Sequence, residues 1–430
     1  MDPIRLGLIG CGGMGLRHVY GLRELRDHAL RIYDLIAVCD SDVNNAEYVA
    51  AAASSLLGTS PRVYTDAIAL LEEESTIEAV DIVTDTRSHH TIACHAFETG
   101  KHVIVEKPMG VTVRACRSMV ARSLRCNRKL AVAHNYRRDP INRLVKALLD
   151  SKAIGDPFMV VQVSIQGGKR IQQGIAWKHI KLNGGYPIEM GVHYADLLMY
   201  FLGTVEEVYA QTAIFEKSRS RSPGRAGLSS FYEHRLGVEP DIVNPTSEDT
   251  LFSLLRFSSG ALGQWTISAA GHGERNWSRL IFGSKGSINA PEDRSGKPIA
   301  VKLGNQAQMR GTDVLQLLPD YEPDDITRKL FSNNFAAYEM PFPEIDRKLI
   351  AVELYDFAES IVGDREPEVG GTEGLKATAL AYALCESGYL KKPVLVQDVE
   401  NDRINGYQDE INASLNLLSP ETVGVEPAKE

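Results

Sequence analysis

The sequence predicts a two-domain α/β protein, in which a parallel α/β domain precedes an α/β domain with an open, mostly antiparallel sheet. Three observations predict this arrangement. The 430 residues are too many for one ordinary hydrophobic core. Up to about residue 134, short apolar runs alternate with helical patterns, as in right-handed βαβ units. Beyond about residue 140, strand-like runs follow one another across tight turns, which favours antiparallel pairing.

The N-terminal elements follow from the spacing of apolar residues. Continuous apolar runs indicate buried strands, and apolar residues at helical spacing among polar ones indicate helices. We expect strands at 4–9, 35–39, 79–84, 102–105 and 130–133, and helices at 13–28, 89–99 and 111–125. This succession places the first domain at residues 1–134.

The second half has a different composition and rhythm. We expect strands at 160–165, 205–213, 251–257, 261–268 and 278–282, and helices at 141–150, 348–362 and 374–388. Residues 217–246 are rich in Ser, Arg, Gly and Pro and indicate a long loop insertion. We place the second domain at 135–398 and expect the polar residues 399–430 to form a peripheral tail.

Charge and composition exclude several classes of protein. The 47 basic and 56 acidic residues give a net charge of -9, so a nucleic-acid binder with a basic face is disfavoured. Docking on an anionic membrane is disfavoured too, and no apolar run approaches the ~20 residues of a membrane helix. The first residues lack the pattern of a signal peptide. The six cysteines show no CxxC spacing, so we expect free thiols in a cytoplasmic protein without a metal site.

A glycine motif follows the first expected strand. Gly10-Cys11-Gly12-Gly13-Met14-Gly15 has the GxGxxG pattern between a strand and a helix, the context that gives this motif meaning. Gly10 permits the tight turn, Gly12 lets the backbone approach a pyrophosphate, and Gly15 lets the helix pack closely on the strand. Gly13 and Met14 open the helix, whose N-terminus favours phosphate groups. The pattern predicts a Rossmann dinucleotide site.

Asp40 lies at the end of the second expected strand, 25 residues after Gly15. A carboxylate at this place accepts hydrogen bonds from the adenosine ribose and repels a 2′-phosphate. The sequence therefore predicts NAD, rather than NADP, as the cofactor.

Three further segments resemble one known family. Residues 84–108 read TDTRSHHTIACHAFETGKHVIVEKP, residues 137–140 read RRDP, and residues 183–196 read NGGYPIEMGVHYAD. These resemble the EKP and GxH motifs of the glucose–fructose oxidoreductase / inositol dehydrogenase / MocA family. The resemblance implies a second domain with a large sheet, through whose open face members often form oligomers. It also implies hydride transfer between a sugar-like hydroxyl and NAD, and here a homodimer or homotetramer.

The resemblance implies roles for three residues in the reaction. Lys107, the lysine of EKP, would hold and polarise the reacting hydroxyl. His193, the histidine of GxH, would take the hydroxyl proton, because its ordinary pKa is near 6.5. Glu189 shares a helix face with His193 but stands where the family has an aspartate, so its exact place in the proton transfer stays open.

Other positions are candidates for contacts with cofactor or substrate. Beside the glycine motif, Asp40 and Lys107, the expected cofactor contacts are Thr84, Asp85, His89 and Glu106. Asp85 replaces a family proline. Beside His193, the expected substrate contacts are Tyr136, Arg137, Trp177, Lys178, Asp196 and His272. In the loop, Arg219, Arg221 and Arg225 are either an anion clamp or, as we prefer, solvent or oligomer contacts.

Three functions remain open at this point. The leading one is an NAD-dependent dehydrogenase of a sugar, cyclitol or glycoside hydroxyl. The second is an enzyme that oxidises a glycoside transiently, cleaves it by elimination and recycles NAD. The third is a non-catalytic NAD sensor, which the presence of both Lys107 and His193 disfavours. The sequence does not identify the sugar, the hydroxyl, the direction of reaction or whether NAD leaves in each cycle.

Overall fold

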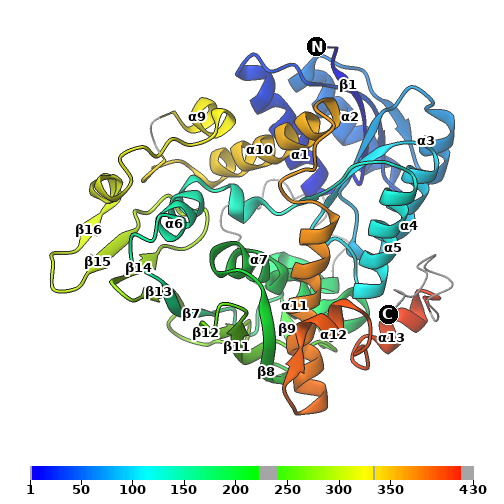
Figure 1. The fold of residues 1–430 in the computed structure, drawn as a ribbon. Helices are drawn as coiled ribbons and strands as arrows, with labels where there is room; N and C mark the ends of the chain where they lie inside the picture. The colour runs from blue at the N-terminus through cyan, green and yellow to red at the C-terminus, as the bar shows by residue number, and fades with distance from the viewer. Residues whose placement is uncertain (1, 222–239, 333–334, 418–430) are drawn as a thin grey trace.

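The structure, a computed structural model, describes residues 2–221, 240–332 and 335–417 (Figure 1). A parallel six-stranded sheet with the order β3-β2-β1-β4-β5-β6 forms the N-terminal part, which is the doubly wound Rossmann arrangement. Its strands are β1 (Ile4–Ile9), β2 (Tyr33–Cys39), β3 (Arg62–Tyr64), β4 (Ala79–Ile82), β5 (His102–Glu106) and β6 (Leu130–Ala133). The short β3 was not expected from the sequence.

The helices of this part begin at polar caps. They are α1 (Gly13–Asp27), α2 (Val43–Leu57), α3 (Ala67–Glu73), α4 (Thr86–Glu98) and α5 (Val113–Arg125). Asp42, Asp66, Asp85 and Thr112 stand at the N-caps of α2 to α5 and accept hydrogen bonds from backbone N–H groups of the first turn. Such a cap contributes about 1 kcal/mol to stability. Asp85 is therefore explained locally as the cap of α4.

A nine-stranded sheet forms the C-terminal part, in the order β16-β15-β14-β13-β7-β12-β11-β8-β17. All its neighbouring strands pair antiparallel except β12 and β7, which are parallel. Its strands are β7 (Pro157–Ile165), β8 (Val205–Ala213), β11 (Thr250–Phe257), β12 (Leu262–Ser268), β13 (Asn276–Gly283), β14 (Gly286–Ala290), β15 (Ala300–Leu303), β16 (Met309–Arg310) and β17 (Val394–Leu395). The predicted fold class, a Rossmann domain plus an α/β domain with a large, mostly antiparallel sheet, is confirmed.

Helices cover one face of the large sheet. They are α6 (Pro140–Asp150), α7 (Gly185–Leu202) and α11 (Gly371–Leu390). Along β11, the side chains of Leu251, Leu255 and Phe257 point into this covered face and are buried, whereas those of Phe252 and Leu254 point outward and are exposed. The second face of the sheet is therefore open, as expected.

The helix α10 (Phe342–Val362) joins the two parts, because it packs along α1 (Figure 1). Arg17 of α1 donates from Nε to Asp346 at 2.7 Å, Lys348 donates to Glu24 at 2.8 Å, and the Tyr33 hydroxyl donates to the Leu354 carbonyl at 2.7 Å. A helix far along the chain thus covers one side of the Rossmann sheet. The smaller α9 (Asp325–Phe331) lies beside it.

The expected peripheral tail is packed into the molecule as far as residue 417. It contains α13 (Asp409–Ser414) and follows α12 (Val396–Glu400). Tyr407, Gln408 and Ile411 are buried, and Gln408 accepts from the Val113 N–H at 2.9 Å while donating to Glu386 at 3.2 Å. Buried apolar residues, which the polar composition concealed, hold this segment against both parts. Residues 418–430 lie outside the described residues.

The ends of the expected long loop form a small two-stranded sheet, β9 (Arg219–Ser220) with β10 (Ile242–Val243). Arg219 is fully buried, pairs with Asp249 at 3.0 Å and donates to three backbone carbonyls. Its role is therefore structural, against the anion-clamp hypothesis. Arg225 and residues 222–239 lie outside the described residues. Within the described residues, no helix has both the length and the apolar character to cross a membrane.

Candidate active site

A cavity of about 700 Å³ opens at the carboxyl ends of the Rossmann strands, where α7 and the turn Ala176–His179 approach them. Ligands of doubly wound sheets bind at this edge, and the volume lies in the ordinary range for ligand sites. One end of the cavity is lined by the glycine motif and Asp40. The other end is lined by Lys107, Glu189 and His193, so the structure brings the predicted cofactor and reaction residues into one space.

The glycine turn leaves no room for a side chain at Gly10 or Gly15. Gly10 has φ +106°, in the region that favours glycine, and a Cβ on it would lie 2.6 Å from the Val83 backbone. A Cβ on Gly15 would lie 2.1 Å from the Gly10 carbonyl oxygen. Gly12, Gly13 and Met14 line the cavity at the N-terminus of α1. This cradle has the tight turn and exposed helix end that a dinucleotide pyrophosphate needs.

Asp40 is held in place at the end of β2. Its carboxylate accepts from the Cys11 N–H at 2.8 Å and from the Asp42 N–H at 3.0 Å, and it lines the cavity. The glycine turn and the carboxylate are thus tied together by a hydrogen bond. The residues present therefore fit NAD, with the pyrophosphate at α1 and the ribose at Asp40.

Replacing Asp40 by asparagine tests this assignment. Hydrogen bonds to a charged group contribute about 1.5–3 kcal/mol, so Asp40→Asn is expected to raise the Kd of NAD about ten-fold. The ratio of NADP to NAD affinity should rise as well, because the repulsion of a 2′-phosphate is removed. Titration of both nucleotides by calorimetry measures this. The control is Asp34→Asn on the same strand, and equal effects of the two substitutions would contradict the assignment.

Lys107, at the end of β5, forms a buried ion pair with Glu189 of α7. Its Nζ donates to the Glu189 carboxylate at 2.8 Å and to the Glu189 carbonyl at 3.2 Å. Lys178 donates to the same carboxylate oxygen at 2.7 Å. Although burial opposes ionisation of both partners, the two lysines lower the pKa of Glu189 to about 2. Glu189 and Glu106 in turn raise the pKa of Lys107 against the effect of burial.

His193 lies one turn of α7 after Glu189 and points into the same cavity. Its ring stacks on Tyr136 with the centroids 3.9 Å apart and the planes 8° apart, and it meets His134 edge-on at 6.2 Å. Burial, and then the positive charge of Lys107, lower the pKa of His193 well below its ordinary value. The imidazole is therefore neutral at pH 7, and its buried Nδ1 has no hydrogen-bond partner among the described residues.

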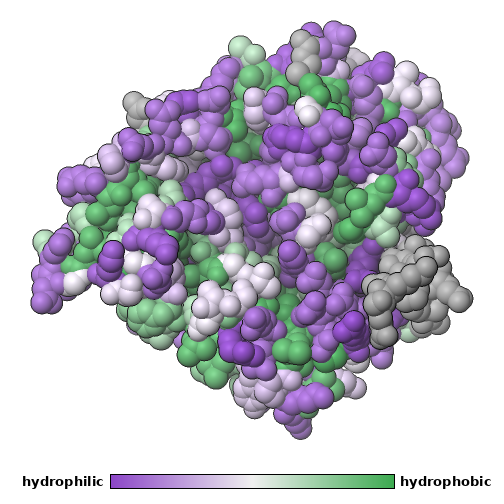
Figure 2. Space-filling view, in the orientation of Figure 1, coloured by the Kyte–Doolittle hydropathy of each residue, from purple (hydrophilic) through white to green (hydrophobic). Residues whose placement is uncertain are grey.

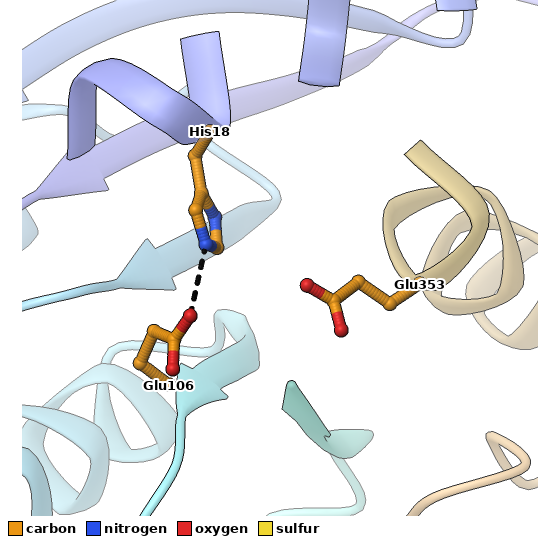
Figure 3. A group of neighbouring side chains, drawn as sticks. All are labelled: His18, Glu106 and Glu353. Carbon is orange, nitrogen blue, oxygen red and sulfur yellow. Dashed lines mark hydrogen bonds and ion pairs between the residues drawn. The ribbon is translucent and has the colours of Figure 1, made fainter. Parts of the chain in front are cut away.

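A buried network lies behind Lys107. Glu106 accepts from the Lys107 N–H at 2.9 Å and approaches His18 at 3.3 Å, and His18 Nδ1 lies 2.7 Å from Asp81. Figure 3 shows the carboxylate of Glu353, from α10, pointing into the space between His18 and Glu106. Burial and the neighbouring Glu106 raise the pKa of Glu353 well above its ordinary value. This network holds Glu106 rigidly and thereby orients the EKP turn.

The same cluster has the spacing of a cation site. The ligand atoms of His18, Glu106 and Glu353 all lie within 4.8 Å of one another, which no other group of these residue types achieves among the described residues. The expectation of no metal stays a prediction.

Several expected contact residues lie away from the cavity. His89 is buried and bonds the carbonyls of Pro108 and Thr84. Arg137 and Asp196 form a buried bidentate pair with each other. His272 is mostly exposed and pairs with Glu216. The motif matches at His89, Arg137 and Asp196 thus mark buried residues that shape the site, and His272, which had no motif match, lies outside it. The expected residues that do line the cavity are Thr84, Asp85, Glu106, Tyr136, Trp177 and Lys178.

Comparison with known proteins identifies this architecture. Residues 4–134 match an oxidoreductase family with an NAD-binding Rossmann fold, and residues 146–396 match the C-terminal α/β domain of the same family. The chain belongs to this oxidoreductase family. NAD is its cofactor, in keeping with the glycine cradle and Asp40.

Relatives of this oxidoreductase have defined activities. A myo-inositol 2-dehydrogenase of Thermotoga maritima is 25% identical over 92% of this chain and 99% of its own length. A levoglucosan dehydrogenase of Pseudarthrobacter phenanthrenivorans is 27% identical over 72% of this chain and 79% of its own. A levoglucosan dehydrogenase solved with NADH matches the fold with a TM-score of 0.71 at 21% identity, covering 92% and 99% of the two chains.

Sequence reasoning missed two arginines in the cavity of this oxidoreductase. Arg17 lies one turn into α1, and Arg294 lies in the loop between β14 and β15. Both side chains approach Asp346 of α10. The spacing Gly13–Arg17 on one helix could have indicated Arg17, because residues four apart share a helix face. No local signal identifies Arg294, since tertiary packing alone brings its loop to the site.

Proposed function

We propose that this oxidoreductase is an NAD-dependent dehydrogenase that oxidises a hydroxyl group of a sugar or cyclitol. The observation that carries the proposal is the placement of Lys107 and a neutral His193 in the same cavity as the glycine cradle and Asp40. The activities named for the curated relatives, on inositol and levoglucosan, support this class of substrate. Bound NAD supplies the hydride acceptor.

Lys107 and His193 act on different atoms of the substrate hydroxyl group: Lys107 binds the oxygen and His193 takes the proton. The Lys107 ammonium, kept charged by Glu189, donates a hydrogen bond to the hydroxyl oxygen and stabilises its developing negative charge. His193, neutral because of burial and nearby cations, accepts the hydroxyl proton. Glu189 positions Lys107 and Lys178 through two short hydrogen bonds. This assigns Glu189 to positioning rather than to proton transfer.

A panel of sugars, inositols and glycosides with NAD tests the proposal. Growth of the NADH absorbance band with formation of a keto or lactone product is expected. Cleavage of a glycoside without net NADH would replace the proposal by the elimination mechanism. NAD binding without turnover of any compound would favour a sensor.

We infer that the open face of the nine-stranded sheet joins copies of this chain. Phe252, Leu254 and Leu262 each expose more than half of their surface, and the strand pairing places them on the same face of the adjacent strands β11 and β12. Figure 2 shows apolar side chains gathered over these strands at the lower edge. A contiguous exposed apolar patch marks an interaction surface, and a symmetric copy is its simplest partner.

Charged residues on this face should separate the oligomer. The double variant Phe252→Lys/Leu254→Lys is expected to elute as a monomer in size-exclusion chromatography with light scattering, because like charges would face each other across the interface. The control is Leu124→Lys, an exposed apolar residue of α5. An unchanged mass of the double variant would overturn the inference.

We infer a cytoplasmic location from the cysteines. All six are free, and four of them are buried, which fits a reducing compartment. This location can be checked by fractionating cells and measuring whether the protein is protected from protease added outside the cytoplasm.

A further inference from the structure

Positive charge is concentrated at the reaction end of the cavity. Lys107 and Lys178 share one carboxylate, Glu189, and Arg17 and Arg294 share another, Asp346. These four cations line this end of the cavity together with the carboxylates Glu106 and Glu189, whereas Asp346 is not among the lining residues. Lys107, Arg294 and Lys178 all lower the pKa of His193 in addition to the effect of burial, so their fields converge on the imidazole. The pocket is better suited to an anion than to a neutral polyol.

Arg294 retains hydrogen-bonding capacity for such an anion. Its Nη1 lies 3.4 Å from Asp346, and its Nη2 donates to the Tyr136 hydroxyl at 3.4 Å, both at the long limit. Its Nε is buried, so only the Nη groups can face the cavity. Asp346 is already engaged by Arg17 through Nε at 2.7 Å, and the neighbouring Asp293 is held by Arg279 at 2.7 Å. A guanidinium carries five N–H donors, so this one can still form a bidentate pair.

The position of Arg294 is fixed next to the reacting groups. Its guanidinium carbon lies 4.8 Å from the ring centre of Tyr136 and 4.9 Å from that of Phe342, and Tyr136 in turn stacks on His193. A ligand of sugar size that reaches the imidazole therefore also reaches the guanidinium. The residue itself has φ +59°, a conformation that side-chain-bearing residues rarely adopt. The loop thus directs this side chain into the cavity at some conformational cost.

We propose that Arg294 binds an anionic substituent of the substrate, so that the enzyme acts on an acidic sugar in preference to its neutral counterpart. The inference rests on the proposed dehydrogenase function and specifies its substrate class. A carboxylate, as in a uronate or aldonate, and a phosphate, as in a sugar phosphate, share the oxyanion geometry that a guanidinium recognises.

Matched sugars test the proposal. Hexoses are compared with their uronates and 6-phosphates, and sorbitol with gluconate, so that each set differs mainly in the anionic group. In at least one set the acidic member is expected to have a kcat/KM about ten-fold or more above the neutral member, as for a hydrogen bond to a charged group. The comparison of each uronate with the corresponding 6-phosphate shows which of the two anionic groups the enzyme prefers. Equal or better turnover of the neutral sugars would overturn the proposal.

Variants assign the preference to Arg294. In Arg294→Met the advantage of the acidic sugar is expected to fall to within about three-fold, with the Kd of NAD unchanged. In Arg294→Lys, which keeps the charge but loses the bidentate fork, it should fall less. The control Arg310→Met removes an exposed arginine of β16 and should leave the preference intact. Persistence of the advantage in Arg294→Met, or loss of NAD affinity in its place, would overturn the assignment.

A binding measurement separates this inference from the proposed function. Each sugar is titrated into the enzyme–NADH complex by calorimetry, which needs no turnover. If no sugar is oxidised but the acidic sugars bind better through Arg294, the dehydrogenase proposal fails and the anion site stands. If neutral sugars are oxidised and acidic ones do not bind, the dehydrogenase stands and the anion site fails.

Discussion

The variant Lys107→Met is expected to lose about three orders of magnitude in kcat, while its Kd for NAD stays within a few-fold of the wild type. The reason is that Glu189 holds the ammonium in the cavity at 2.8 Å, where we propose that it stabilises negative charge on the hydroxyl oxygen of the substrate. Removing one preorganised donor of this kind typically lowers kcat 10²–10³-fold. Steady-state rates with the best sugar of the panel, with NAD titrated separately, measure both quantities.

We do not expect Lys107→Met to disturb the fold. Glu189 keeps Lys178 as a partner at 2.7 Å in the variant, so no buried carboxylate is left unpaired. Lys107→Arg keeps the charge but presents it in a different geometry, and we expect it to remain strongly impaired. Lys152→Met removes an exposed lysine paired with Asp156 and serves as the control. A kcat for Lys107→Met within ten-fold of the wild type would remove Lys107 from the reaction.

The second large effect is expected for His193. Replacement by phenylalanine keeps a ring that can stack on Tyr136 but removes the proton acceptor, and should lower kcat by about 10²–10⁴, the usual contribution of general acid–base catalysis. His193→Asn provides a smaller side chain as a second variant, and near-UV circular dichroism checks the packing. Full activity of His193→Phe would show that another group takes the proton.

The pH dependence follows from the direction of the pKa shifts. The base is active when deprotonated, and burial together with Lys107 lowers the pKa of His193 below 6.5, so the acid limb of kcat/KM moves to lower pH. Lys107 is active when protonated, and its pKa is raised above 10.5 by Glu189 and Glu106 despite burial, so the alkaline limb moves to higher pH. At saturating NAD we expect a plateau from about pH 6.5 to 10, and an acid limb at or above pH 7 would contradict the neutral imidazole.

Local signals allowed the sequence to predict the Rossmann half and to point to Lys107 and His193, which the structure brings into one cavity. The turn at Gly10–Gly15 requires particular backbone geometry, and the strands of a parallel sheet are continuous apolar runs, so both are recognisable along the chain. Lys107 and His193 stand in motifs whose spacing is carried by single elements, β5 with its turn and α7. The short β3, the two-residue strands and the pairing of β12 with β7 lack such signals.

The remaining errors concern tertiary partners. Arg137 and Asp196 are 59 residues apart, and nothing along the chain indicates that they neutralise each other instead of binding substrate. The burial of Tyr407 and Gln408 depends on α11 and α5, which a polar local composition does not reveal. Arg294 contacts the site only because α10 brings Asp346 and Phe342 beneath it. In each case long-range packing, rather than local pattern, determines the role.

Because α10 lies late in the chain, it affects how the protein folds during its synthesis on the ribosome. The α1 side of the Rossmann sheet, including the charged Arg17 and Glu24, stays uncovered until the chain has been synthesised through residue 362. The N-terminal half can therefore form its packing against α10 only late in synthesis, and we expect its folding to be completed together with that of the second half. The finished molecule should accordingly melt in one cooperative calorimetric transition rather than in two.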